Sequence, residues 1–516
     1  MSSKRFSRRL PYATEILQNI FTRLPTKERV AVARASKRFY LIIADNDGYW
    51  YQQFDLCYPE TNTSVKEWLR WFDKAAARVE DNHYKKPLKF YIANGVLGMS
   101  LFSLPLNWFR RYTARKQLES NWKHGRGNSF ICDYPAGAID SKNNAESPFY
   151  MLTTNIWGTV IRVGKCIYYS PLQDKSPKLV ALKAPDTHAS TLQSAGKLSA
   201  AVNNQFIAIL VSSSQKCYFW RLDKAAKPTF SGCLELPREV ESIEDLRANW
   251  LVFRTKDNMN RGKAYIYDLT KDGPTPRVST YYGWHIYKIH ELRGNKAIVY
   301  AAHLGSRDNI SSAQSQDYYY NQRQYGASNA QAENTNLHWT LWRVTPFSLC
   351  TEKAETHSMA FSMSSPNSEW KSRQLTDDSY LIWRDDSNKN GFIIVHSVLK
   401  GIQFAKEFTG ATPTVSINND RVIMSTTTEW SVTTLSTKQL IHKTKIGDDL
   451  TYIGTALERF WVTRHEEGVI IFDVKYNDEF SSNFYRNATA PIGISDRGIV
   501  SMFSNAIVWF DVGMFF

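Results

Sequence analysis

Three arginines stand at the same place in three predicted β-hairpins, each at the end of the first strand. They are Arg254 in LVFRTKD, Arg384 in LIWRDDS and Arg464 in WVTRHEE. A guanidinium can bind a phosphate or a carboxylate through two parallel hydrogen bonds, so these side chains could together hold an acidic or phosphorylated target peptide. Each arginine could instead pair with an acid of its own turn, which is the commoner arrangement for such side chains. The acids in those turns are Asp257, Asp385 and Glu466.

The common catalytic and metal-binding motifs are missing from the sequence. It has no Gly-x-Ser-x-Gly elbow and no phosphate-binding loop ending in Gly-Lys-Ser or Gly-Lys-Thr. His290-Glu291 is followed by Leu-Arg-Gly, so the second histidine of the zinc motif is absent. Residues 386–391 match the opening of a calcium loop, but Ser397 occupies the position that requires a bidentate Glu. We therefore expect residues 386–391 to form a hairpin turn. For the protein as a whole, we expect no catalytic residue, no metal and no cofactor.

Basic charge is concentrated in the first quarter of the chain. The 516 residues carry a formal net charge of +15. Residues 1–126 hold 23 Lys and Arg against 11 Asp and Glu, whereas the remaining residues hold 41 against 38. This asymmetry predicts an acidic partner for the N-terminal part. Because no basic face with interleaved aromatic residues recurs downstream, we expect no nucleic-acid partner.

The cysteines and the N-terminus indicate a reducing compartment. The six cysteines are scattered without a Cys-x-x-Cys pair, and the first residues lack the apolar core of a signal peptide. Both features predict a location in the cytoplasm and/or the nucleus. Residues 90–109 carry no charge and are long enough for a membrane span. Their Asn, Gly and Pro residues make them poor in hydrophobicity, so we expect a buried linker and no membrane partner.

Helical periodicity extends over residues 10–130. A first helix is predicted to begin near Thr14 and to end before Pro25, and a second apolar segment covers residues 27–43. Short helices over about 45 residues bury too little surface to be stable alone. The first helix therefore needs a partner, or it docks on the rest of this chain. Its apolar face comprises Ile16, Leu17, Ile20, Phe21 and Leu24.

The order and spacing of these residues resemble the F-box motif. Glu15-Ile16-Leu17, Leu24-Pro25 and Ser36-Lys37-Arg38-Phe39 follow the offsets of that family, although its leading Leu-Pro pair is displaced here to Leu10-Pro11. The resemblance implies that residues 8–55 form an F-box, which docks on the acidic Skp-family adaptor of Skp–cullin–F-box ubiquitin ligases and through it on a cullin. The implied adaptor-binding residues are Leu10, Pro11, Ile16, Leu17, Ile20, Phe21, Leu24, Pro25, Val30, Ala35, Phe39 and Trp50.

A further helix is predicted between the F-box and the second half of the chain. Trp108, Leu118 and Trp122 recur at near-helical offsets, and Gly125 is expected to end the helix. The segment from Leu118 to Gly125 resembles the one that leads from F-box to propeller in F-box/WD-repeat proteins. Residues 56–130 are therefore expected to form a helical linker.

From about residue 149 the periodicity changes to two. Short β-branched and aromatic runs are paired into eight hairpins, spaced 37 to 75 residues apart. The longest interval contains residues 305–336, a Ser-, Asn-, Gln- and Tyr-rich stretch predicted to be a disordered loop, and without it 43 residues remain. The residues that anchor the hairpins are Tyr169, Trp220, Tyr267, Trp342, Val395, Val432, Phe472 and Phe510.

A repeat of 40–50 residues with four short strands is typical of a β-propeller blade. Tyr267-Asp268, Phe472-Asp473 and Phe510-Asp511 resemble the Trp-Asp dipeptide of WD repeats. The predicted fold is thus multidomain, α then all-β: a helical F-box and linker, followed over residues 131–516 by a WD-repeat-like propeller. Seven or eight blades are expected, because the last blade is often completed by a strand from before the first.

Three classes of function fit these expectations. In the first, the F-box binds the adaptor and the propeller captures a target protein for ubiquitination, so the protein acts by proximity and performs no covalent chemistry. In the second, the same modules form a protein-interaction scaffold without a role in ubiquitination. In the third, the propeller carries an unrecognised catalytic site. Adaptor binding separates the first two classes from the third.

Overall fold

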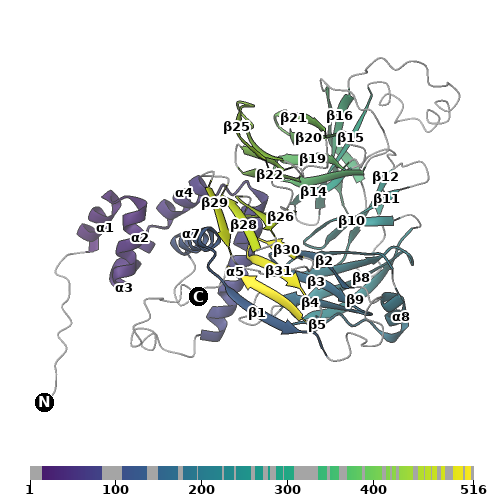
Figure 1. The fold of residues 1–516 in the computed structure, drawn as a ribbon, viewed down its shortest axis with the longest axis horizontal. Coiled ribbons are helices and arrows are strands. Elements are labelled where there is room, and N and C mark those ends of the chain that lie inside the picture. The colour runs from purple at the N-terminus through teal and green to yellow at the C-terminus, as the bar shows by residue number, and fades with distance from the viewer. Residues whose placement is uncertain are drawn as a thin grey trace. The chain divides into compact units, whose positions relative to one another are not determined.

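The computed structural model divides the chain into two compact units (Figure 1). We call them the helical unit, with residues 1–60, 68–121 and 515–516, and the propeller-like unit, with residues 61–67 and 122–514. The predicted linker, 56–130, is thus divided between them. The structure describes residues 14–83, 107–135, 149–171, 178–194, 196–223, 226–237, 240–256, 262–270, 277–278, 286–293, 296–306, 335–345, 349–358, 369–385, 390–409, 414–418, 421–425, 429–445, 451–457, 459–465, 468–473, 478–482, 492–503 and 506–512.

The first four helices of the helical unit are short. Pro25 separates the first two helices, as predicted, because proline cannot continue the preceding helix. The second apolar segment, residues 27–43, contains two helices, because Ser36 is extended, with φ −156° and ψ 139°, and divides it. The helices are α1 (Thr14–Arg23), α2 (Thr26–Ala35), α3 (Lys37–Ala44), α4 (Asp47–Cys57), α5 (Thr63–His83) and α7 (Trp108–His124). Gly125, with φ 58°, follows α7 as expected.

Aromatic side chains form the core of the helical unit. The fully buried Trp50 ring lies 4.6 Å from the Phe109 ring and 5.4 Å from the Tyr112 ring, centroid to centroid. Its indole Nε1 donates to the backbone oxygen of Ile43 at 2.7 Å, so its polar atom is satisfied. Helix α7 therefore packs on the F-box segment through rings that lie 60 residues apart in sequence.

Eight four-stranded antiparallel sheets make up the propeller-like unit within the described residues. This confirms the predicted fold class, in which a helical N-terminal part is followed by an all-β part. In pairing order the sheets are β2 (Phe149–Asn155), β3 (Gly158–Val163), β4 (Cys166–Pro171), β5 (Val180–Ala181); β6 (Leu198–Val202), β7 (Phe206–Val211), β8 (Lys216–Leu222), β9 (Pro228–Glu235); β10 (Val240–Arg247), β11 (Trp250–Lys256), β12 (Gly262–Asp268), β13 (Arg277–Val278); β14 (Ile286–Arg293), β15 (Lys296–Ser306), β16 (Thr335–Val344), β17 (Leu349–Ser358); β18 (Glu369–Gln374), β19 (Ser379–Asp385), β20 (Asn390–Ser397), β21 (Gly401–Thr409); β22 (Thr414–Asn418), β23 (Arg421–Ser425), β24 (Glu429–Thr434), β25 (Leu440–Lys445); β26 (Thr451–Ala456), β27 (Phe460–His465), β28 (Gly468–Asp473), β29 (Asp478–Ser482); and β30 (Ile492–Ser495), β31 (Gly498–Met502), β32 (Ala506–Asp511), β1 (Asn128–Asp133).

Each of the eight hairpin anchors lies on the third strand of a different sheet, from Tyr169 on β4 to Phe510 on β32. The last sheet is completed by β1, which precedes the first sheet in the chain. The predicted loop over 305–336 is shorter than expected, because Ser306 pairs with Thr335 and extends the β15–β16 hairpin at both ends. Residues 307–334 lie outside the described residues. A helix that the periodicity did not indicate, α8 (Asp186–Ser194), joins β5 to β6.

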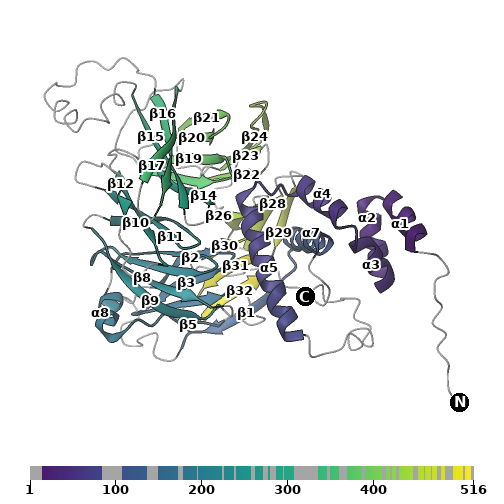
Figure 2. The same ribbon diagram turned by 180° about the vertical axis from the view of Figure 1, so that it is seen from behind.

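The first strands of successive sheets lie against one another, as the inner strands of a propeller do. This holds in the order β26, β30, β2, β6, β10, β14 and β18. The sheet of β2 and the sheet of β6, which also holds β8 and β9, lie side by side in both views (Figure 1, Figure 2). Polar side chains at the turns that follow β2 and β6 link each of these sheets to the next one. Asn155 donates to the backbone oxygen of Val202 at 2.8 Å, and Asn203 donates to that of Ala248 at 2.8 Å.

The acids of the three WD-like dipeptides tie strands together within a sheet. Asp268, Asp473 and Asp511 each end a third strand and bind a residue of the turn between the first two strands. Their partners are Asn249, Arg459 and Arg497, respectively. The acids of these dipeptides therefore connect the third strand of a sheet to the turn between its first two strands. Their positions at hairpin ends in the sequence did not indicate these partners.

The described helices include none that is long and apolar enough to cross a membrane. Of the segment predicted as a buried linker, residues 90–106 lie outside the described residues. Of its last three residues, Asn107 precedes α7, and Trp108 and Phe109 are its first two residues; all three belong to the helical unit. Phe109 is buried there, and Asn107 donates through its side chain to the backbone oxygen of Ala44 at 3.4 Å.

Buried histidines and tyrosines join the sheets of β14 and β18. The Tyr300 and Tyr380 rings stack with centroids 3.8 Å apart. The Tyr300 hydroxyl forms a hydrogen bond with His396 Nδ1 at 3.0 Å, and the Tyr380 hydroxyl forms one with His290 Nδ1 at 2.6 Å. Burial, helped by the positive field of His357 and Lys353, lowers the pKa of His396 to about 3.

This cluster predicts a loss of stability in acid. Below pH 6.5 the unfolded chain protonates His396 while the folded chain does not, so the free energy of unfolding falls by about 1.4 kcal/mol per pH unit between 6.5 and about 3. Chemical denaturation at several pH values measures the slope. The substitution His396→Asn keeps an acceptor for Tyr300 but takes up no proton, so it should flatten the dependence. An unchanged slope in this variant would contradict the assignment.

Candidate docking surfaces

Helix α1 has two apolar faces with different environments. Leu17 and Phe21 are 6% and 7% exposed, and the Phe21 ring packs edge-on against Phe39 of α3 with centroids 5.3 Å apart. Ile16 and Ile20, one turn apart, are 50% and 49% exposed. The single apolar face predicted from the sequence is therefore divided, and only the isoleucines are free to dock on another molecule.

The other predicted adaptor-binding residues have varied exposure. Leu10 and Pro11 lie outside the described residues. The fully buried Trp50 cannot contact a partner, so its predicted role in docking is wrong: it supports the core on which α1 rests. Leu24, Val30 and Phe39 are partly buried, whereas Pro25 and Ala35 are exposed.

Arg29 holds the α1–α2 turn, a role that the sequence reasoning missed. Its guanidinium donates to the backbone oxygens of Leu24, at 2.8 Å, and Thr22, and lies 4.0 Å from the centre of the Tyr49 ring. These bonds satisfy carbonyls that the end of α1 leaves open. One feature of the sequence could have indicated this role: Arg29 lies one turn before Ala33, on the face that α2 buries.

A hollow of about 400 Å³ lies beside α1. Its lining combines apolar and polar side chains from three helices and the turn before α4. Phe21 lines this hollow, whereas Ile16 and Ile20 do not, so the hollow and the isoleucine stripe are separate features. The residues that line it are Gln18, Asn19, Phe21, Thr22, Arg29, Ile42, Ile43, Asp45 and Asn46.

The three candidate arginines occupy equivalent strands. Arg254, Arg384 and Arg464 lie on β11, β19 and β27, the second strand of their sheets, near the turn to the third. Arg254 pairs with Glu244 of the neighbouring strand β10, with Nε 3.3 Å from the carboxylate. Local pairing therefore occurs, but with an acid other than the predicted Asp257, which lies outside the described residues.

The Arg254 ion pair leaves little of this guanidinium for a ligand. The side chains of Arg254 and Glu244 are 12% and 15% exposed, and Ser242 also donates to Glu244, at 2.8 Å. The side chains of Arg384 and Arg464 lie outside what the structure describes, so their target-binding role stays a prediction.

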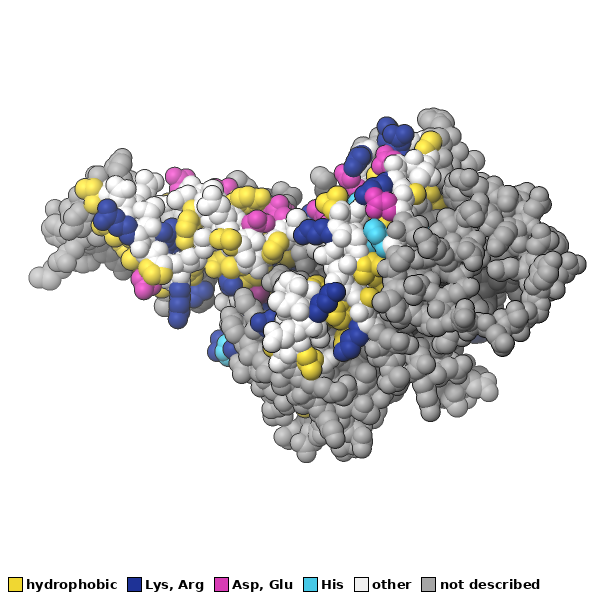
Figure 3. Space-filling view, turned by 90° about the horizontal axis from the view of Figure 1, so that it is seen from above, with side chains coloured by type: hydrophobic (Ala, Val, Ile, Leu, Met, Phe, Trp, Pro, Cys, Tyr) yellow, Lys and Arg dark blue, Asp and Glu magenta, His cyan; other side chains and the backbone are white. Residues whose placement is uncertain are grey.

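We also looked at charge and metal-ligand geometry among the described residues. Among the described side chains on the face drawn in Figure 3, Lys and Arg are interspersed with Asp and Glu. Within the described ranges, no group of three His, Cys, Asp or Glu side chains is placed to hold a metal ion.

Comparison with known proteins identifies the N-terminal segment. Residues 9–55 match the F-box-like family model. The chain therefore carries an F-box-like domain at its N-terminus, followed by a β-sheet-rich, propeller-like fold. No curated protein matches the chain.

Several solved structures are similar to this chain over part of its length. Sqt1 from Saccharomyces cerevisiae has a TM-score of 0.45 at 11% identity, covering 74% of this chain and 99% of that chain. Hsv2 from Kluyveromyces lactis has a TM-score of 0.36 at 10% identity, covering 64% and 97%. The WD40 domain of SCAP from fission yeast has a TM-score of 0.29 at 10% identity, covering 62% and 95%.

Proposed function

We propose that this protein is the substrate-receptor subunit of a Skp–cullin–F-box ubiquitin ligase and acts in the cytoplasm and/or the nucleus. The F-box-like segment would dock on the adaptor, and the propeller-like unit would hold the target protein through an acidic or phosphorylated segment. The observation that carries the proposal is the pair of half-exposed isoleucines on α1, within residues that match the F-box-like model.

The physical basis of docking is the burial of this stripe. Covering Ile16 and Ile20 with a partner surface would contribute up to about 1.5–3 kcal/mol for each fully buried side chain, and less for the part that the fold already covers. The excess of Lys and Arg over residues 1–126 would add attraction to an acidic adaptor and speed the encounter.

The receptor itself would perform no covalent step. It would hold a target lysine near the ubiquitin-carrying enzyme, which raises the effective concentration of the reacting groups. F-box and propeller modules are typically interaction modules, which fits this division of labour.

The direct test is assembly with purified adaptor and cullin. We expect the intact chain to co-elute with the adaptor, and with cullin only when the adaptor is present, and the complex to weaken as salt rises. Failure to co-elute at low salt would overturn the proposal. If the complex forms but ubiquitin is not transferred to proteins bound by the propeller-like unit, the protein is a scaffold.

A further inference from the structure

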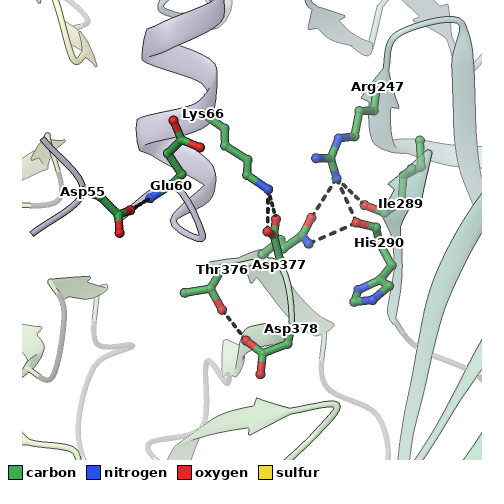
Figure 4. Close-up of polar contacts among 10 residues, drawn as sticks. Asp55, Glu60, Lys66, Arg247, Ile289, His290, Thr376, Asp377 and Asp378 are labelled. Carbon is green, nitrogen blue, oxygen red and sulfur yellow. Dashed lines mark hydrogen bonds and ion pairs between the residues drawn. The ribbon is translucent and has the colours of Figure 1, made fainter. Parts of the chain in front are cut away.

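An arginine at the end of β10 is held in place through one of its nitrogens. Arg247 Nη1 donates to the backbone oxygens of Ile289 and His290 on β14, at 3.0 and 3.1 Å, and to Oε1 of Gln374 on β18, at 3.1 Å (Figure 4). Gln374 is held in turn, because its amide nitrogen donates to the His290 oxygen at 3.3 Å. Arg247 therefore links three sheets of the propeller-like unit, and the orientation of its guanidinium is fixed.

The other edge of this guanidinium is open. An arginine has five N–H donors, and the bonds above use only those on Nη1. Among the described residues, Arg247 Nε and Nη2 have no hydrogen-bond partner, the side chain forms no ion pair, and neither atom is buried. Nε and Nη2 form the edge with which an arginine binds a carboxylate through two parallel hydrogen bonds.

Two acids close to this network already have cations of their own. Asp377, in the β18–β19 turn, pairs with Lys66 of the same unit (Figure 4). Glu291 of β14 pairs with Arg293 at 2.7 Å. Because both ion pairs are neutral as a whole, neither acid compensates the charge of Arg247.

The remaining groups of the network leave one positive charge. Asp245 accepts from a backbone nitrogen of β14 at 2.8 Å, and Lys288 donates to a backbone oxygen of β10, so one negative and one positive charge balance. Burial lowers the pKa of His290, and the charge of Arg247 adds to this effect, so the imidazole is neutral at pH 7. The charge of Arg247 is therefore the one without a counter-charge.

From this geometry we propose that Arg247 anchors a binding site for a single carboxylate, carried by an acidic side chain of a partner protein or by a small carboxylic acid. The planar Nε–Nη2 edge matches the two oxygens of a carboxylate, and one negative charge balances the one that the network leaves over. Because the guanidinium is already held in place, binding costs little side-chain freedom.

This site is separate from the arginines predicted from the sequence. Arg247 lies beside the turn from β10 to β11, where it pairs with Trp250, whereas Arg254 pairs with Ser242 toward the other end of the sheet. Arg254 also has Glu244 as its counter-ion, which Arg247 lacks among the described residues. Carboxylate binding at Arg247 does not require that the chain docks on an adaptor.

The test measures weak binding to the full chain by NMR saturation transfer. The first probe is a capped pentapeptide with one Glu between flanking Gly residues, and its counterpart has Gln in place of Glu. We expect the Glu peptide to bind about tenfold more tightly, because a charged bidentate pair is stronger than a neutral hydrogen bond. Acetate, titrated against chloride at equal ionic strength, is the second probe. Acetate binding as tight as that of the Glu peptide assigns the site to small carboxylic acids, and weaker binding assigns it to acidic side chains.

Two variants locate the binding at Arg247. Gln374→Glu keeps the shape of the side chain but places a carboxylate beside the guanidinium, so it should weaken binding of the Glu peptide about tenfold. Arg247→Lys keeps the charge but loses the bidentate edge, and should weaken binding to a similar degree. Gln205→Glu is the matched control, because Gln205 is exposed in the β6–β7 turn and the substitution adds the same charge. It should bind as the original chain does.

Equal binding of the Glu and Gln peptides would overturn the inference. Undiminished binding by Gln374→Glu would overturn it as well, and so would a loss of the same size in Gln205→Glu. The midpoint of thermal unfolding is measured for every variant. If Arg247→Lys does not fold, Gln374→Glu decides alone, since its new ion pair with Arg247 keeps the link between the sheets.

Discussion

Ile20→Asp should weaken binding of the Skp-family adaptor about 100-fold, which corresponds to about 2.8 kcal/mol. The substitution removes a half-exposed isoleucine from the stripe and would place a carboxylate in an apolar contact, where an unpaired charge is costly. Because the side chain already faces solvent, the helical unit should stay folded, with a stability change within about 0.5 kcal/mol. Titration with labelled adaptor and far-UV circular dichroism measure the two effects.

Gln18→Asp provides the matched control. Gln18 is exposed on the same helix, about half a turn from the isoleucines, and the substitution introduces the same charge. It should bind the adaptor as the original chain does. If Ile20→Asp also binds normally, the α1 stripe is not the docking surface, and the register taken from the F-box motif is wrong for this chain.

Asp473→Ala should lower the free energy of unfolding of the propeller-like unit by about 3–5 kcal/mol. Asp473 is fully buried and binds the Arg459 guanidinium through both oxygens, at 2.8 and 2.6 Å. Removing the acid leaves a buried positive charge without its counter-ion. Chemical denaturation followed by tryptophan fluorescence measures the loss.

Two further variants test whether the loss of stability comes from the unpaired charge of Arg459 or would follow any substitution at the end of a sheet. Asp268→Ala, at the equivalent half-buried position, should cost about 1.5 kcal/mol, because its partners there are neutral. The double variant Arg459→Met/Asp473→Leu should recover most of the stability, since no unpaired charge remains. A double variant as unstable as Asp473→Ala would contradict the charge argument.

Much of the fold follows from local patterns in the sequence. The eight hairpin anchors mark the third strands of eight sheets because alternation of period two and turn residues act over a few residues. The ends of α1 at Pro25 and of α7 at Gly125 are equally local, since they depend on backbone conformations that these residue types prefer or forbid. The break at Ser36 was missed because no Pro or Gly marks it.

The candidate sites depended more on tertiary contacts. The residue pattern alone predicts that α1 is amphipathic, that aromatic residues recur along α7, and that charged residues stand at hairpin turns. The folded structure was needed to show that Phe21 packs inward while Ile20 stays exposed, and that Trp50 lies in the core. It was also needed to show that Arg254 pairs with Glu244 and that Lys66 pairs with Asp377. Periodicity tells which residues share a face, whereas the partner across that face comes from strands or helices tens to hundreds of residues away.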